Sequence, residues 1–286
     1  MSTAAMPFAS PMTMPARADG MKVVDRNLEG RTAIVTGSTS GIGLGVADAL
    51  AQRGATVILN GLGDAGQIEM TRAELAMKHD TMVHYHGADL SKADAVADMI
   101  RFAAEIAGGV DILVNNAGIQ FVSRIEEFPI AKWDAILAIN LSSVFHAVRA
   151  ALPSMRARGF GRIINVASAH GLVASPFKSA YVAAKHGVIG LTKTIALEAA
   201  DANITCNAIC PGYVWTPLVE KQIEEQAAAH SIPREKVITD VLLKAQPNKR
   251  FATVEEIGAL AAFLSGPYGQ GITGAALPVD GAWTAQ

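Results

Sequence analysis

Three side chains near the middle of the sequence have the types and spacing of a proton-transfer site. Ser168 is followed by twelve residues and then Tyr181, and Lys185 lies four residues further on. Residues four apart on a helix project from one face, so the phenol and the ammonium would lie together. An isolated tyrosine titrates at about pH 10, and a neighbouring cation lowers that pKa. Tyr181 can then exchange a proton with a hydroxyl or carbonyl oxygen that Ser168 also hydrogen-bonds.

A glycine-rich turn comes near the start of the chain, in the run Thr36-Gly37-Ser38-Thr39-Ser40-Gly41-Ile42-Gly43. It follows an apolar segment and precedes a helical pattern. Glycines let the backbone turn tightly and approach a pyrophosphate, and a helix N-terminus offers N–H groups and a positive dipole end. We therefore predict a dinucleotide site. Its predicted contacts in this turn are Gly37, Thr39, Ser40, Gly41, Ile42 and Gly43.

The end of the second expected strand indicates which dinucleotide is bound. An acid there binds the 2′-hydroxyl of NAD, and an arginine binds the 2′-phosphate of NADP. This chain has Leu59-Asn60-Gly61-Leu62-Gly63-Asp64, with no acid where the strand ends and no basic residue in the turn. A buried phosphate without a cation is unfavourable, so we expect NAD. Asp89 and Leu90, after the third strand, are expected to meet the adenine.

The sequence offers little for metal or disulfide chemistry. His84 and His86 share one face of a strand, but no cysteine or glutamate completes a ligand spacing, so we expect no metal. Cys206 and Cys210, four apart on a strand, would lie about 13 Å apart, beyond the reach of a disulfide. Two free thiols favour a reducing compartment.

The composition describes a chain with a large buried core. Of 286 residues, 50% are hydrophobic and 17% charged, which argues against disorder. The net charge of −2 gives no broad positive surface of the kind that binds nucleic acid. The longest segment without charged residues, 257–279, is broken by glycine and proline, so we expect no membrane span. We expect neither nucleic acid nor membrane as a partner.

Short apolar runs alternate with longer helical patterns along the chain. Strands are expected at 32–36, 56–59, 82–86, 112–115, 162–168, 204–209 and 276–279, and helices at 41–52, 65–79, 93–107, 133–157, 181–200 and 254–264. This alternation predicts an α/β fold: a doubly wound, Rossmann-type, seven-stranded parallel sheet with helices on both faces. Ligands of such sheets bind at the carboxyl ends of the strands, where the polar motifs above occur.

The expected organisation is a single domain at 28–286, preceded by a disordered extension at 1–27. A start at Met21 or a weak organellar presequence are alternatives for the extension. Residues 216–250 make an unusually long connection. It forms either a substrate lid or a surface helical pair with a solvated charged face.

These motifs together resemble the short-chain dehydrogenase/reductase family from about residue 28 onward. The matching segments are Thr36-Gly37-x3-Gly41-x-Gly43, Asn115-Asn116-Ala117-Gly118, Asn140, Ser168, Tyr181-x3-Lys185 and Pro211-Gly212. The resemblance implies a catalytic tetrad of Asn140, Ser168, Tyr181 and Lys185. Tyr181 would be the acid/base, Lys185 would bind the nicotinamide ribose and lower the Tyr181 pKa, and Asn140 would hold a water. It also implies cofactor contacts at Asn116, Ala117, Gly118, Pro211, Gly212, Val214 and Thr216.

A closer resemblance is to the bacterial dehydrogenases of D-3-hydroxybutyrate, a subfamily that converts this acid to acetoacetate with NAD. It rests on runs at 115–120, 167–175, 178–181, 216–222 and 279–284. It implies that a small carboxylate substrate is bound by Gln120, Ser168, His170, Lys178, Tyr181, Gln222 and Trp283. Taken singly, Lys178 could be a solvated cation, His170 a turn residue and Trp283 a packing anchor. Tyr213 and Trp215 are expected to alter packing on the nicotinamide side.

Two other functions remain open at this point. One is a reductase of a β-ketoacyl thioester or of another small hydroxy acid, although Trp283 and the long connection favour a small closed pocket. The other is a non-catalytic dinucleotide-binding module, which would have no need of the Tyr181 hydroxyl. The family resemblance implies a cytoplasmic homotetramer.

Overall fold

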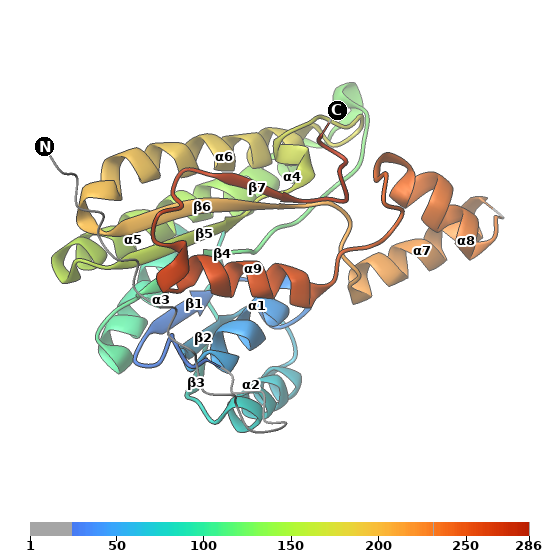
Figure 1. The fold of residues 1–286 in the computed structure, drawn as a ribbon. Coiled ribbons are helices and arrows are strands. Elements are labelled where there is room, and N and C mark those ends of the chain that lie inside the picture. Colours follow the sequence, from blue (N-terminus) through green and yellow to red (C-terminus); the bar gives the residue numbers. More distant parts are fainter. Residues whose placement is uncertain (1–24, 231, 286) are drawn as a thin grey trace, which may run out of the picture.

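The central element is a seven-stranded parallel sheet (Figure 1), seen in a computed structural model that describes residues 25–230 and 232–285. The expectation of disorder for residues 1–27 lies outside the described residues as far as residue 24, whereas Arg26 is placed and donates to the His79 and Asp80 carbonyls. The strands are β1 Thr32–Val35, β2 Thr56–Asn60, β3 Val83–His86, β4 Ile112–Asn115, β5 Gly161–Val166, β6 Ile204–Pro211 and β7 Ala276–Val279. Their order is β3-β2-β1-β4-β5-β6-β7, so the direction of winding reverses between β1 and β4. The predicted fold class is confirmed.

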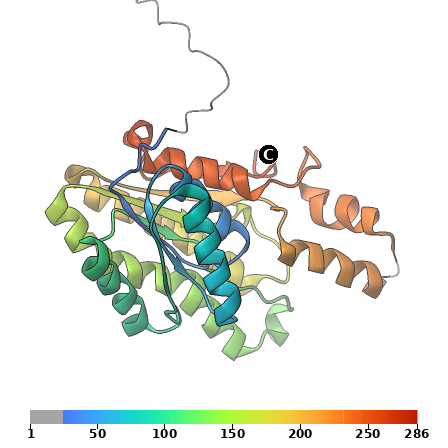
Figure 2. The ribbon, with the colours of Figure 1, turned by 90° about the horizontal axis from the view of Figure 1, so that it is seen from below.

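Both faces of the inner strands are buried, and most of their side chains are apolar. Along β1, Ala33 and Val35 face one core and Ile34 the other, as the two-residue repeat of a strand requires. The helices of the first face are α1 Gly41–Gln52, α2 Ala65–His79 and α9 Val254–Ser265. Those of the second are α3 Ala93–Ala107, α5 Ser143–Arg158 and α6 Ser179–Ala199. Figure 2 shows the sheet between these two layers.

One long helical stretch differs from the expected 133–157. It consists of α4 Ile130–Leu137, a π-helical turn Ala138–Ser142 and α5, and it is long and apolar enough to cross a membrane by length and composition alone. In the structure its α5 part packs on α3 and on the sheet. The π turn widens the helix at Asn140. Such single π turns inside α-helices often occur at functional sites.

The connection after β6 forms a helical hairpin that projects beyond the body of the sheet (Figure 1). It contains α7 Pro217–His230, α8 Arg234–Lys236, a π turn Val237–Leu242 and a 3₁₀ turn Leu243–Ala245. Ile223, Val237 and Leu242 form a small core of its own. Whether residues 216–250 act as a lid stays a prediction.

Candidate active site

The proton-transfer residues meet just beyond the carboxyl ends of β5 and β6. Ser168 lies two residues past β5, where its Oγ accepts a hydrogen bond from the His170 N–H at 3.1 Å and so begins a 3₁₀ turn. That bond ends the strand at Val166, two residues before the expected end. Tyr181 and Lys185 project from the first two turns of α6. The structure thus brings together three residues of the predicted tetrad.

Tyr181 is half-buried, and the removal of its phenol from water raises its pKa above the ordinary value. A hydrogen bond with the Ser168 side chain acts in the opposite direction and lowers it. The expected lowering of the Tyr181 pKa by Lys185 is not among the effects seen here and stays a prediction. The Lys185 ammonium donates to the carbonyl oxygen of Val166 at 2.8 Å and lies 5.6 Å from the Tyr181 ring centre.

Lys185 is 4% exposed, and burial lowers its pKa to about 8. Near physiological pH, the Lys185 amine is therefore neutral in a fraction of the molecules. The Cys210 thiol lies near enough to influence it electrostatically. An amine that titrates near neutrality can both hydrogen-bond a ligand hydroxyl and pass on a proton.

Asn140 is buried in the π turn, and both of its amide atoms bind one residue. Its Oδ1 accepts from the Ile119 N–H at 2.8 Å, and its Nδ2 donates to the Ile119 carbonyl at 2.9 Å. Asn140 therefore fixes the path of the loop that follows β4. A water held by Asn140 remains a prediction.

The glycine-rich turn has the geometry of an anion cradle. Gly37 and Gly41 have φ of +60° and +57°, and a Cβ at Gly43 would lie 2.2 Å from the Gly37 carbonyl. Asn116 Nδ2 donates to the Thr36 and Gly37 carbonyls, which draws both oxygens inward. The Ser40 side chain does not cap α1, so the N–H groups of its first turn remain available for a phosphate. These residues fit a dinucleotide.

The turn after β2 explains sterically why no acid stands at position 61. A Cβ on Gly61 would lie 2.5 Å from Thr39 Oγ1. Asn60, at the strand end, donates instead to the His86 and Ala88 carbonyls. Asp64 begins α2 by accepting from Gln67 N.

Two further predicted cofactor segments reach the same edge. Thr216 lies beside the glycine turn, since a Cβ on Gly41 would be 3.7 Å from Thr216 Cγ2. Val214 is buried, and Pro211 ends β6. Asp89 is exposed and bonds Ser91 in its own turn, so its contact with adenine stays a prediction.

A cluster of nitrogen and aromatic groups adjoins Tyr181 on the substrate side. Lys178 Nζ lies 3.3 Å from His170 Nε2. The His170 ring packs edge-on against Trp283, with centres 4.9 Å apart, and against Tyr181 at 6.3 Å. Burial and the Lys178 charge lower the His170 pKa to about 4, so the imidazole is neutral at pH 7. Since Nε2 faces the ammonium, Nδ1 carries the hydrogen, and this atom is buried without a partner among the described residues.

Tyr213, expected from the sequence only to alter packing on the nicotinamide side, lies beside the substrate cluster. Its ring lies parallel to that of Trp283 at 7°, with centres 5.9 Å apart, and Lys178 Nζ lies 6.0 Å from its centre. The only sequence signal was an aromatic residue directly after Pro211-Gly212. Trp215, by contrast, packs on Phe251 at the base of the hairpin.

The two glutamines expected to bind substrate come from two other segments of the chain. Gln120 is exposed on the loop after β4, and Gln222 is half-buried on α7, in the projecting hairpin (Figure 1). The structure shows neither residue bonded to Lys178 or His170 in the part of the chain it describes.

The residues that resembled metal ligands have other partners. His84 and His86 both pack against the Phe102 ring, and His86 Nε2 lies 3.3 Å from an Asp98 oxygen. Within residues 25–230 and 232–285, no three metal-binding side chains gather. Both cysteines are buried free thiols.

Residues 31–227 match the model of the short chain dehydrogenase family. The chain is 56% identical over 256 residues to the D-beta-hydroxybutyrate dehydrogenase of Rhizobium meliloti, covering 90% of this chain and 99% of that one. It is 56% identical to the enzyme of the same name from Cupriavidus necator, covering 91% and 100%. Among solved structures, L-sorbose reductase from Gluconobacter frateurii, complexed with NADPH and L-sorbose, superposes with a TM-score of 0.87 at 30% identity. That match covers 92% of this chain and 99% of the reductase.

Proposed function

Because the chain belongs to the short chain dehydrogenase family, we propose that it is an oxidoreductase that interconverts (R)-3-hydroxybutyrate and acetoacetate with NAD. The observation that carries the proposal is that two pairs of polar residues lie side by side beyond the carboxyl ends of the strands. Ser168 and Tyr181 form a proton-transfer pair, and Lys178 with His170 forms a nitrogen-lined corner beside it. A substrate with a hydroxyl and a carboxylate a few bonds apart matches this pairing.

The residues divide the proton chemistry between them. Ser168 and Tyr181 hold the oxygen that changes between hydroxyl and carbonyl, and Tyr181 takes or returns its proton. Lys185, with its lowered pKa, lies on the same helix face and can exchange that proton onward. Bound NAD supplies the acceptor for the hydride. We propose Gly37, Gly41 and Gly43 at its pyrophosphate and Lys185 at its ribose.

The carboxylate end of the substrate is assigned to Lys178 and His170. Lys178 is half-buried, and none of the carboxylates in the described ranges pairs with it, so its charge is available to a ligand. The neutral His170 adds an N–H donor from its unpartnered Nδ1. We propose that Trp283 closes the pocket, and that Gln120 and Gln222 join it when the hairpin folds over as a lid.

NAD is proposed over NADP on the turn after β2. Leu59-Asn60-Gly61-Leu62-Gly63-Asp64 contains no cation, and Thr39 fills the space beside Gly61. A 2′-phosphate would therefore lie next to neutral groups and Asp64. Because L-sorbose reductase, which has a similar fold, binds NADPH, the preference of this chain for NAD over NADP is the property to measure first.

We also propose a cytoplasmic homotetramer that acts on small carboxylates, with neither membrane nor nucleic acid as partner. Two buried, unpaired thiols suit a reducing compartment. Exposed apolar side chains on the outer helices, among them Phe145, Leu197 and Phe263, suit subunit contacts. Light scattering during size exclusion tests the tetramer, and cell fractionation tests the location.

The deciding experiment is the initial rate with NAD+ and NADP+, each with (R)- and (S)-3-hydroxybutyrate. Turnover restricted to NAD+ and the (R) acid is expected. Tyr181→Phe should lose nearly all turnover while NAD+ binding stays within about twofold, because it removes only the hydroxyl that transfers the proton. Activity on a β-ketoacyl thioester instead would keep Tyr181 and overturn the carboxylate site. Tight NAD binding without any turnover would indicate a binding module.

A further inference from the structure

The base of the projecting hairpin is a short parallel bridge that we call the lid root, residues 213–215 and 246–252. The Trp215 N–H donates to the Ala252 carbonyl, and the Ala252 N–H donates to the Tyr213 carbonyl, each at 2.9 Å. The segment that leaves the sheet and the segment that returns to it are thereby joined. Tyr213, in this bridge, is also the residue whose ring stacks on Trp283.

Gln246 connects the two segments a second time, through its side chain. Its Oε1 accepts from the Tyr213 N–H at 2.7 Å, and its Nε2 donates to the Arg250 carbonyl at 2.8 Å. The residue is 1% exposed, so neither bond competes with water. A buried amide with both ends bonded to backbone is a rigid spacer between Tyr213 and the returning chain.

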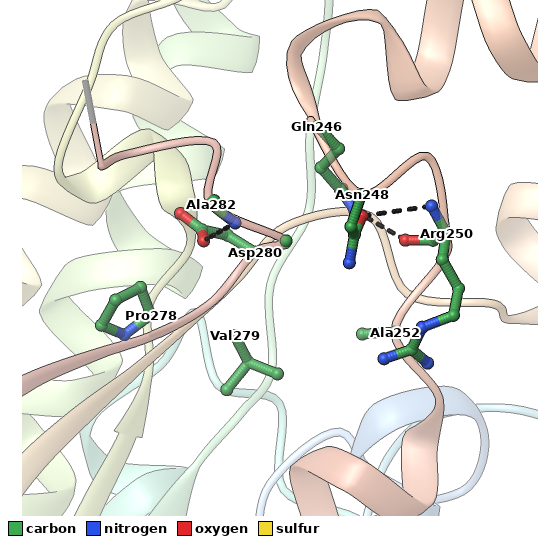
Figure 3. Close-up of a pocket in the computed structure, with 9 residues that line it drawn as sticks. Gln246, Asn248, Arg250, Ala252, Pro278, Val279, Asp280 and Ala282 are labelled. Atoms are coloured by element: carbon green, nitrogen blue, oxygen red, sulfur yellow. Dashed lines mark hydrogen bonds between the residues drawn. The ribbon is translucent and has the colours of Figure 1, made fainter.

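The surroundings of Gln246 combine a close backbone contact with an open space. Gly212 lies against it so closely that a Cβ there would be 2.6 Å from Gln246 Oε1. On another side is a cavity of about 190 Å³, lined by Gln246, Asn248, Arg250, Val279, Asp280 and Ala282 (Figure 3). On the side of this open space, the two hydrogen bonds hold the side chain in place.

The C-terminal turn on the other side of the cavity, Asp280 to Ala282, leads directly into Trp283. Asp280 accepts from the Ala282 N–H at 3.1 Å and from the Thr284 N–H at 2.9 Å, which curls the chain around Trp283. The Asn248 N–H donates to the Gly281 carbonyl at 3.3 Å, so the lid root and this C-terminal turn are joined. Both partners of the Tyr213–Trp283 stack are therefore positioned from the cavity walls.

We propose that Gln246 is a positioning residue for the substrate pocket: it holds the Tyr213 ring against Trp283 and ties that stack to the returning end of the hairpin. Gln246 acts through Tyr213 and takes no part in proton transfer. The inference rests on the proposed function for the identity of the substrate.

The test compares Gln246→Met with a matched control, Asn207→Leu. Asn207 is also fully buried, on β6, and it also makes one donor and one acceptor bond to backbone, with Ile272 and Ala275. Each variant thus removes two buried hydrogen bonds at similar volume. Gln246→Met should raise KM for (R)-3-hydroxybutyrate about tenfold, with kcat and KM for NAD+ within about twofold, since ground-state and transition-state binding weaken together. Asn207→Leu should lower Tm and leave both KM values unchanged.

A second readout needs no turnover. In protein labelled with 5-fluorotryptophan, the ¹⁹F resonance assigned by Trp283→Phe should shift in Gln246→Met and stay in place in Asn207→Leu. An unmoved resonance overturns the positioning role, whatever happens to KM, and so does a moved resonance with unchanged KM. Absence of wild-type turnover on this acid would overturn the proposed function and the substrate half of the inference. The fluorine spectrum would still decide whether Gln246 holds the stack.

Discussion

Replacing Lys178 by methionine tests the assignment of the substrate carboxylate most directly. Methionine keeps the length and apolar stem of the side chain and removes only the ammonium. Lys178 begins α6 without capping it through its side chain, so the helix should persist. Its Nζ has one polar side-chain neighbour in the described ranges, His170 Nε2 at 3.3 Å.

The expected loss follows from the partial burial of this charge. A charge-assisted hydrogen bond contributes about 1.5–3 kcal/mol, and removing one partner of a more deeply buried pair costs upward of about 2 kcal/mol. For the half-buried Lys178 we take about 2–3 kcal/mol. At about 1.4 kcal/mol per factor of ten, KM for (R)-3-hydroxybutyrate should rise about 30- to 150-fold. The value of kcat should change little, because the carboxylate keeps its charge during the reaction.

The assay is steady-state reduction of NAD+ with the acid and with its uncharged methyl ester. Lys193→Met serves as the control, since Lys193 is an exposed cation on the same helix. The wild type should discriminate against the ester, and Lys178→Met should lose that discrimination. If Lys178→Met kept the wild-type KM for the acid while remaining folded, Lys178 would have no place in the carboxylate site.

Three other perturbations have defined outcomes. The folded-state pKa of His170 is about 4, below its unfolded value of about 6.5, so the unfolded chain binds more protons between these values. The free energy of unfolding should therefore fall by up to about 3 kcal/mol as the pH drops from 6.5 to 4. In urea titrations, His170→Gln should not show this part of the pH dependence. Burial raises the pKa of Cys206 to about 12 and of Cys210 to about 11, so neither thiol should react with iodoacetamide at pH 7.5 until urea unfolds the chain; prompt labelling would contradict their burial. Gly61→Ala should destabilise by about 1–3 kcal/mol through contact with Thr39, and adding Thr39→Ala should recover most of that in thermal melts; an equal Tm in single and double variants would refute the contact.

The sheet could be predicted because most of its strands are short apolar runs between turn residues. Errors at element ends were one to three residues and had local causes. The His170 N–H binds Ser168 Oγ and ends β5 early, and the helix expected at 133 begins at Ile130. The π turn at Asn140 had no sequence signal, since it depends on the reciprocal bonds with Ile119.

The candidate site was predictable where residue type and spacing determine geometry. Tyr181 and Lys185 share a helix face by spacing alone. The direction of the Tyr181 pKa shift was not predictable, because removal of the phenol from water raises the pKa and depends on how the folded chain packs around α6. Gln246 carried no signal either, since its partners are backbone groups, which every sequence supplies.

Because the lid root joins its two ends, the helical hairpin could be replaced by another segment without changing the rest of the fold. Its two ends are already paired, by the bonds between Trp215, Ala252 and Tyr213, and its apolar residues Ile223 and Val237 are buried within the hairpin. The entropic cost of closing a loop rises only slowly with its length, by about 0.6 kcal/mol per doubling. A segment of different length or sequence could therefore be inserted between the same two anchors without altering the sheet. Within such a fold, evolution can change the substrate by replacing one segment while the residues that move the proton stay where they are.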